Sequence, residues 1–127
     1  LISQKGRVHF PIGKCINDGL AASGAESRSD VVRKVCDMVD HSIHCGYRLF
    51  PCNYIAFDEV NGTSQYATEY TPDDVKSFDE YIARQLARVD VDNITPEEQA
   101  YMRTMMLTMY ANPLKNRIAA LDCGNCD

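Results

Sequence analysis

The sequence predicts a mainly α-helical chain that opens with one β-strand, and two patterns support this expectation. From residue 29 onward, apolar residues recur at three- and four-residue spacing, which is typical of amphipathic helices. Within residues 7–16, by contrast, Val8, Phe10, Ile12 and Ile16 share one parity, the period of a half-buried strand. We therefore expect one strand followed by four or five helices, in a single segment over residues 1–127.

The expected strand has no partner within the chain. Pro11 has no backbone N–H for a ladder, so the strand would lie at a sheet edge or contain a bulge. No second stretch is a convincing strand, and an isolated strand is not stable. Together with Leu1 in place of an initiator Met, this leads us to expect further sequence upstream that pairs with residues 1–16.

The first two helices are predicted from caps and apolar spacing. Residues 17–28 are rich in Asn, Gly, Ala and Ser and are expected to form a loop. Ser29 can cap a helix that runs to about Cys45 and stops at Gly46. A short buried helix should then begin at Pro51 and end at the Asn61-Gly62 turn.

Two similar start signals predict the remaining helices. Thr71-Pro72 and Thr95-Pro96 each combine a cap, a proline in the first turn and two following acids. Asn112-Pro113 is expected to end the second of these helices, because proline disfavours a helical residue before it. A last short helix would then run through Leu121, so that the helical region covers residues 29–121.

Charge excludes some partners. The net charge of −5 divides into +2 over residues 1–50 and −7 over residues 51–127. The acidic part argues against nucleic acid, whose phosphates need Lys and Arg, and against lying flat on an anionic membrane. No signal peptide and no apolar run near the roughly 20 residues of a membrane span is present, so we expect a cytoplasmic protein.

The sequence contains no recognisable catalytic, cofactor-binding or metal-binding motif. Asp37–His41 and Asp40–His44 are spaced to meet on a helix, and surface ion pairs are the simpler reading. The Cys123-Gly124-Asn125-Cys126 pair is half of a zinc or redox motif, and it lacks two further ligands. We interpret the six cysteines as reduced thiols and predict no cofactor.

Two sets of residues resemble a known family. The first is Arg7-Val8-His9-Phe10 with residues 12–17, which resembles the late strand of lysophosphatidate (1-acylglycerol-3-phosphate) acyltransferases, except that Cys15 replaces a proline. The second resembles a C-terminal extension found in Bacteroidetes-type bacterial members of that family. It includes Asn53, Tyr54 and Asp58 of Asn-Tyr-Ile-Ala-Phe-Asp, and Asn112 and Pro113 of Tyr-Ala-Asn-Pro, all of unknown role.

The resemblance implies a function for a larger protein in phospholipid biosynthesis. The family transfers an acyl group from an acyl-thioester to a lysophospholipid hydroxyl at the inner face of the cytoplasmic membrane, using a His-x-x-x-x-Asp box. No histidine here has an acid five residues later, so this chain alone is expected to be inactive. Residues 1–16 would be the last strand of a missing N-terminal catalytic domain, or would pair with a second copy.

Two alternatives come from other classes. One is a helical protein-interaction module without enzymatic activity, which would bind through the apolar segment 47–60. The other is a small redox or zinc protein built on the cysteines.

Overall fold

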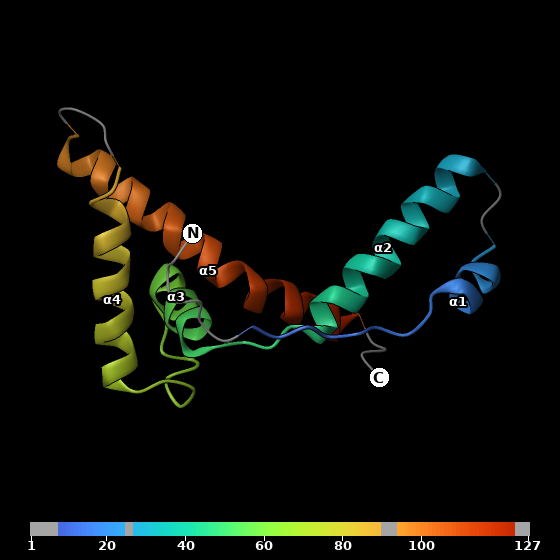
Figure 1. The fold of residues 1–127 in the computed structure, drawn as a ribbon, viewed down its shortest axis with the longest axis horizontal. Coiled ribbons are helices and arrows are strands. Elements are labelled where there is room, and N and C mark those ends of the chain that lie inside the picture. The colour runs from blue at the N-terminus through green and yellow to red at the C-terminus, as the bar shows by residue number, and fades with distance from the viewer. Residues whose placement is uncertain (1–7, 25–26, 90–93, 124–127) are drawn as a thin grey trace. The chain divides into compact units, whose positions relative to one another are not determined.

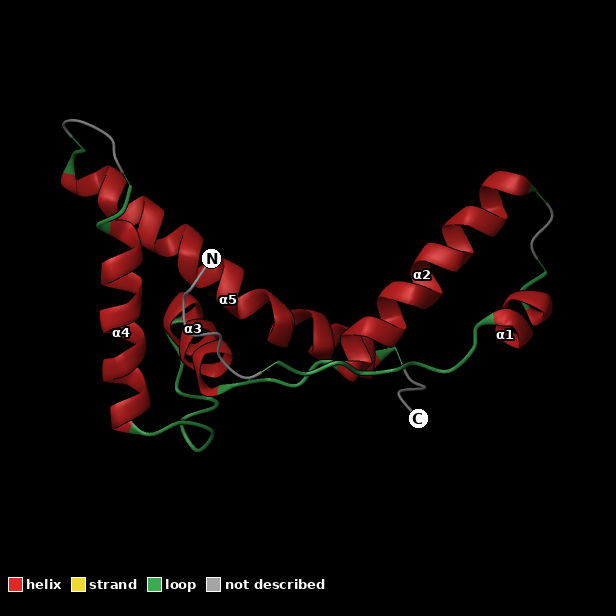
Figure 2. Ribbon diagram, in the orientation of Figure 1, coloured by secondary structure: helices red, strands yellow, loops and turns green. Residues whose placement is uncertain are grey.

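The computed structural model describes residues 8–24, 27–89 and 94–123, and within these ranges it is helical with no strand (Figures 1 and 2). In chain order, its helices are α1 (Asn17–Ala22), α2 (Arg28–Gly46), α3 (Pro51–Asn61), α4 (Pro72–Leu86) and α5 (Pro96–Asp122). The expectation of a mainly α chain is therefore confirmed, and the expectation of an N-terminal strand is wrong. No helix in the described ranges has the length and apolar content needed to cross a membrane.

The chain divides into two compact units. One unit combines Leu1–Arg48 with Ala119–Asp127, and the other is Leu49–Ile118. Helices α1 and α2 belong to the first unit, whereas α3, α4 and most of α5 form the second. Each unit has its own packing.

The predicted strand is an irregular segment without ladder bonds in its described part, residues 8–16. Val8, Phe10 and Ile12 are 68%, 84% and 98% exposed, so the shared parity does not bury them. The physical reason is that a strand needs a partner strand, and that Pro11 has no N–H to donate to one. Arg7 lies outside the described residues.

The irregular N-terminal segment approaches α2 closely at two glycines. A Cβ on Gly13 would lie 2.3 Å from Ser42 Oγ, and one on Gly46 would lie 2.9 Å from Pro11 Cβ. Hydrogen at these positions therefore allows the backbone to approach the helix. Residues 17–28 were expected to form a loop, but they contain the short helix α1.

Helix α2 begins two residues earlier than its predicted cap implied. The side chain of Ser27, not Ser29, accepts a hydrogen bond from the Asp30 N–H at 3.1 Å. Asp30 therefore lies in the first turn, where its charge complements the helix dipole. The helix ends at Gly46, as the sequence indicated.

The second unit has a small core between three helices. Phe78 and Ile82 of α4 pack in one cluster with residues of α3 and α5, and Ile82 is fully buried. The other buried members of this cluster are Ile55, Ala56, Leu107 and Ala111. Edge-to-face ring contacts of Tyr110 with Phe78 and Tyr81, at 5.2 Å and 6.0 Å, extend this packing.

The starts of α4 and α5 confirm the capping signals. The Thr71 side chain accepts from Asp74 N–H at 3.2 Å, and the Asp74 carboxylate accepts in return from Thr71 N–H at 2.9 Å. Thr95 and Glu98 form the same reciprocal pair. Each reciprocal pair, known as a capping box, satisfies backbone N–H groups that a helix start otherwise leaves unpaired.

The expected break at Asn112-Pro113 is wrong, because α5 continues through Pro113 to Asp122. Pro113 has no N–H to donate to the carbonyl one turn back, a cost that packing must offset. Buried Ala111 and Leu114 flank this position, and their burial favours a continuous helix.

Replacing Ile82 with alanine should lower the free energy of unfolding of the chain by ~3 kcal/mol, because the buried side chain leaves a cavity. Met109→Ala is the control, since Met109 is 57% exposed, and it should change stability by only ~0.5 kcal/mol. Chemical denaturation followed by circular dichroism measures both. Equal effects of the two variants would contradict the assignment of the core.

Candidate functional site

The buried carboxylate of Asp58 is the most highly connected side chain among the family-like positions. Asp58 is 3% exposed and lies on α3, and its Oδ1 accepts hydrogen bonds from Thr63 Oγ1 at 2.7 Å and Gln65 N–H at 3.0 Å. Its Oδ2 accepts from Tyr66 N–H and from the Tyr70 hydroxyl, both at 3.0 Å. All four donors come from the connection between α3 and α4, so this carboxylate holds that connection in place.

These bonds also set the ionisation of Asp58. Burial opposes the charged form, but the hydrogen bonds from Thr63, Tyr66, Tyr70 and Gln65 outweigh it and hold the pKa of Asp58 below its ordinary value. The partner hydroxyl responds in the opposite sense: burial and the bond to Asp58 raise the pKa of Tyr70. The carboxylate of Asp58 is therefore a charged hydrogen-bond acceptor at neutral pH. This suits a structural anchor and not a proton-transferring acid.

Asn53 is the other buried polar side chain in the described core, at 8% exposure. Its Oδ1 accepts from Phe50 N–H at 2.9 Å, at the start of α3. Its Nδ2 donates to the carbonyl of Tyr110 on α5 at 2.8 Å. Asn53 thus joins two helices that are far apart in sequence.

The other three family-like positions have packing or surface roles. The ring of Tyr54 lies 5.5 Å from that of Tyr66, and burial raises its pKa. Asn112 is exposed, and Pro113 lies inside α5. The structure therefore brings together Asn53, Tyr54 and Asp58 on α3, and the hydrogen bonds of Asn53 and Asp58 are made with residues of the second unit.

Arg103 is a structural residue that the sequence did not single out. Its guanidinium lies 2.7 Å from Glu59 Oε1 on α3 and 2.8 Å from Asp79 Oδ1 on α4. These two bonds raise the pKa of Arg103. The only signal in the sequence was its isolation, since Arg103 is the one charged residue between Ala100 and Asn112.

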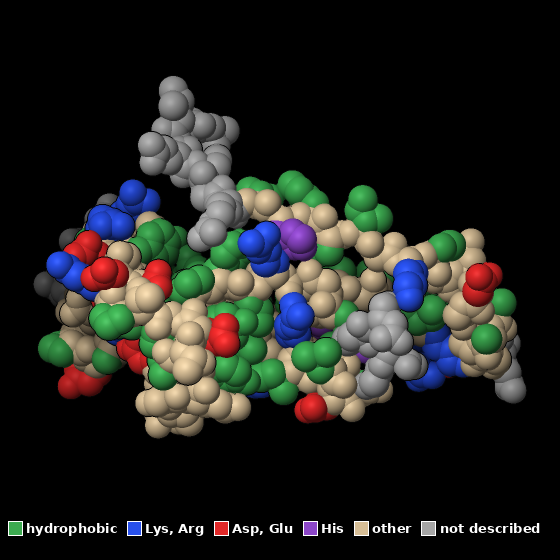
Figure 3. Space-filling view, turned by 90° about the horizontal axis from the view of Figure 1, so that it is seen from below, with side chains coloured by type: hydrophobic (Ala, Val, Ile, Leu, Met, Phe, Trp, Pro, Cys, Tyr) green, Lys and Arg blue, Asp and Glu red, His purple; other side chains and the backbone are tan. Residues whose placement is uncertain are grey.

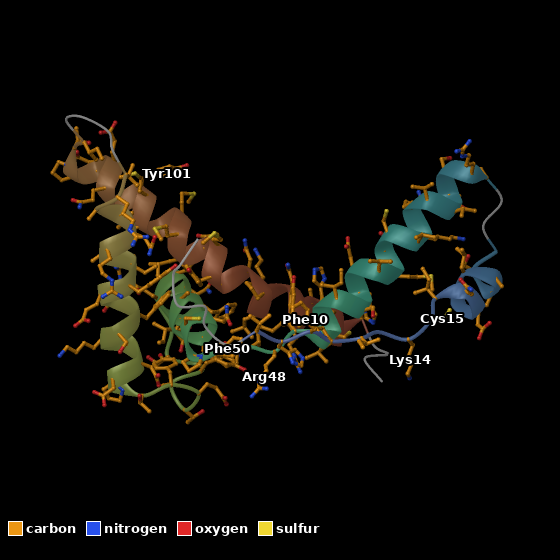
Figure 4. All side chains as sticks on the ribbon, in the orientation of Figure 1. Phe10, Lys14, Cys15, Arg48, Phe50 and Tyr101 are labelled. Carbon is orange, nitrogen blue, oxygen red and sulfur yellow. The ribbon has the colours of Figure 1, made fainter. Side chains whose placement is uncertain are left out.

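The first unit contains a cavity of about 540 Å³ between the irregular segment and α2. Its lining includes two potentially reactive side chains, His41 and Ser42, as well as Lys14. Its other lining residues are Pro11, Ile12, Gly13, Cys15, Ile16, Gly19, Met38, Ile43, Cys45 and Gly46. In Figure 4 the side chain of Lys14 extends away from the ribbon, and Lys14 is exposed.

The histidines and cysteines do not assemble into a metal centre in the described ranges. His41 Nε2 lies 3.5 Å from Cys45 Sγ, and the ring of His44 packs 5.5 Å from that of Tyr47. No group of His, Cys, Asp or Glu among the described residues is arranged to hold a metal ion. Cys126 lies outside them.

The expectation that every thiol is reduced needs correction, because Cys45 is disulfide-bonded. Cys15, Cys36, Cys52 and Cys123 are free. Burial raises the pKa of Cys52, which packs against the core and is therefore a poor nucleophile.

Comparison with protein-family models, with curated proteins and with solved structures finds no match to this chain.

Replacing Asp58 with asparagine should lower the free energy of unfolding by ~3 kcal/mol at pH 7, because an amide NH₂ then faces donors that need an acceptor. Asp73→Asn is the matched control, since Asp73 is an exposed acid in the first turn of α4. Urea denaturation of both variants measures the difference. Equal stabilities would contradict the anchoring role of Asp58.

The same variant should have a characteristic pH dependence. The pKa of Asp58 is lower in the folded chain than in the unfolded chain. The charge of Asp58 therefore stabilises the folded chain fully above about pH 4, and this stabilisation is lost as the pH falls through the folded pKa. The stability gap between the parent chain and Asp58→Asn should therefore narrow on acidification. A constant gap from pH 7 to pH 2 would show that the charge of Asp58 contributes nothing.

Proposed function

We propose that this chain is a non-catalytic helical region of a glycerolipid acyltransferase, which moves an acyl group from an acyl-thioester to a lysophospholipid hydroxyl. One observation supports this proposal most: in the motif Asn-Tyr-Ile-Ala-Phe-Asp, which carries the family resemblance, Asn53 and Asp58 are buried and hold the second unit together. A motif used in this way is a signature of a folded region. It is not a set of reacting groups.

The chemistry is expected to come from outside this chain. Acyl transfer by a histidine base requires a carboxylate that orients the imidazole. The residues five positions after His9, His41 and His44 are Lys14, Gly46 and Leu49, so none completes the family's box. We propose that a catalytic domain in the same polypeptide supplies the base and binds both substrates at the inner face of the cytoplasmic membrane.

A second candidate is a protein-interaction module without chemistry, and the surface of α5 favours it. Tyr101, Met105 and Met109 are 64%, 45% and 57% exposed at four-residue spacing, and Tyr101 projects from the helix in Figure 4. Tyr and Met are common where proteins meet.

Polar groups beside these residues are already bonded. The hydroxyls of Thr104 and Thr108 donate to the carbonyls of Ala100 and Thr104 on the same helix. The face of α5 that carries Tyr101, Met105 and Met109 therefore offers a partner mainly apolar contacts. Elsewhere, Figure 3 shows apolar side chains in several separate places on the face that it draws.

The native polypeptide distinguishes the two candidates. Immunoprecipitation from source cells with an antibody to this chain should recover a polypeptide well above 14.3 kDa. This polypeptide should convert lysophospholipid and a labelled acyl-thioester to phospholipid, whereas the 127-residue chain alone should not. Replacing the histidine of its His-x-x-x-x-Asp box with alanine should abolish that activity.

Three results would contradict the acyltransferase proposal. A native mass near 14.3 kDa would leave no room for a catalytic domain and would favour the interaction module. Activity that survives the histidine replacement would mean that the box does not act as the family's does. A recovered polypeptide of high mass without acyl transfer would equally count against the proposal.

A further inference from the structure

Helix α2 exposes an apolar stripe with the spacing of a coiled-coil seam. The stripe comprises Val32, Cys36, Val39 and Ile43, which are separated by four, three and four residues. Val32, Val39 and Ile43 are 56%, 39% and 45% exposed, and Cys36 is also exposed. A seam of alternating three- and four-residue steps is the pattern by which one helix packs against another.

Most of the stripe lies outside the face of α2 that packs within its own unit. Ser42 and Met38 approach the N-terminal segment, at Gly13 and Gly19, and of the stripe only Ile43, itself 45% exposed, also lines the cavity of this unit. Lys34 donates to the carbonyl of Ser23 at 2.6 Å and is also on that side. The helix therefore has one occupied face and one apolar face that contacts solvent.

We propose that the stripe pairs with α2 of a second copy of this chain, in an antiparallel, two-fold symmetric arrangement. In such a seam Cys36 packs opposite Val39 of the other copy, and Val32 packs opposite Ile43. Each residue then meets an apolar residue, and the interface is the same on both copies. This inference does not depend on the proposed function.

The charges beside the stripe favour a second copy in this orientation. Arg33 and Asp40 are exposed, lie seven residues apart and therefore occupy the same flank of the stripe. Antiparallel pairing brings Arg33 of each copy opposite Asp40 of the other, which makes two symmetric ion pairs. Parallel pairing instead brings Arg28 of one copy opposite Arg33 of the other, and this repulsion disfavours it.

Arg33 can turn to such a partner at little cost. Its side chain is 70% exposed and contacts Asp30 one turn earlier in α2. Surface ion pairs of this kind contribute little to stability. Asp30 keeps a second cationic neighbour, since Lys34 Nζ lies 3.7 Å from its Oδ2.

The seam is short, so the dimer should be weak. Four positions spanning residues 32–43 cover roughly 16 Å of helix, at about 1.5 Å per residue. The surface area that two such short helix faces bury is below the roughly 1,200 Å² of a stable interface. Self-association should therefore appear at concentrations from about 10 µM to 1 mM.

Sedimentation equilibrium of the full chain over that concentration range tests the proposal. Arg33→Asp places two acids opposite each other and should weaken the dimer by about tenfold, as should Asp40→Arg. The double variant Arg33→Asp/Asp40→Arg restores opposite charges and should recover the parent affinity. Asp37→Arg, an exposed control outside both flanks of the stripe, should leave it nearly unchanged.

Three outcomes would overturn the proposal. The first is a parent chain that remains monomeric throughout the range while circular dichroism shows it folded. The second is a double variant that stays as weak as the single ones, which would exclude the Arg33–Asp40 pairing. The third is equal weakening by Asp37→Arg, which would mean that net charge, and not the seam, controls association.

Discussion

A carboxylate buried away from water needs several donors, and this requirement at Asp58 organises the second unit. Gln65 and Tyr66 supply two backbone N–H groups, and Tyr70 and Thr63 supply hydroxyls. Because all four lie after Gly62, where φ is 62° and the chain leaves α3, the path to α4 is fixed by one side chain. The position of α4 against α3, and the burial of Phe78 and Ile82, depend on that path.

The packing of α5 depends on polar contacts at two levels of the same unit. Asn53 donates to the carbonyl of Tyr110, close to the proline in α5, and Arg103 joins α5 to Glu59 and Asp79 about two turns earlier. Buried Leu107 lies between these levels, and buried Ala111 directly follows Tyr110. Hydrogen-bonded side chains at both ends of an apolar contact specify the rotation of α5 about its axis, which apolar packing alone specifies less sharply.

Much of this architecture could be predicted from local sequence, because caps and turns act over three or four residues. Thr71, Thr95 and Gly62 mark their helix ends correctly for that reason. The strand over 7–16 was wrong because a period of two specifies which side chains share a face but not whether a partner exists. Pro113 misled because the burial of Leu114 and Ala111, a tertiary effect, outweighs a local break.

The candidate site has the same division between local and distant information. The sequence singled out Asn53 and Asp58 through an unusual motif, but their bonds to Tyr110 and Tyr70 reach 57 and 12 residues along the chain. Such distances hide a structural role from any local reading, so a motif of this kind is easily taken for a reactive one. A catalytic acid needs access to substrate and an adjustable proton, whereas Asp58 is enclosed and has a lowered pKa. The contacts of Asn53 and Asp58 therefore give this motif a structural role in the second unit.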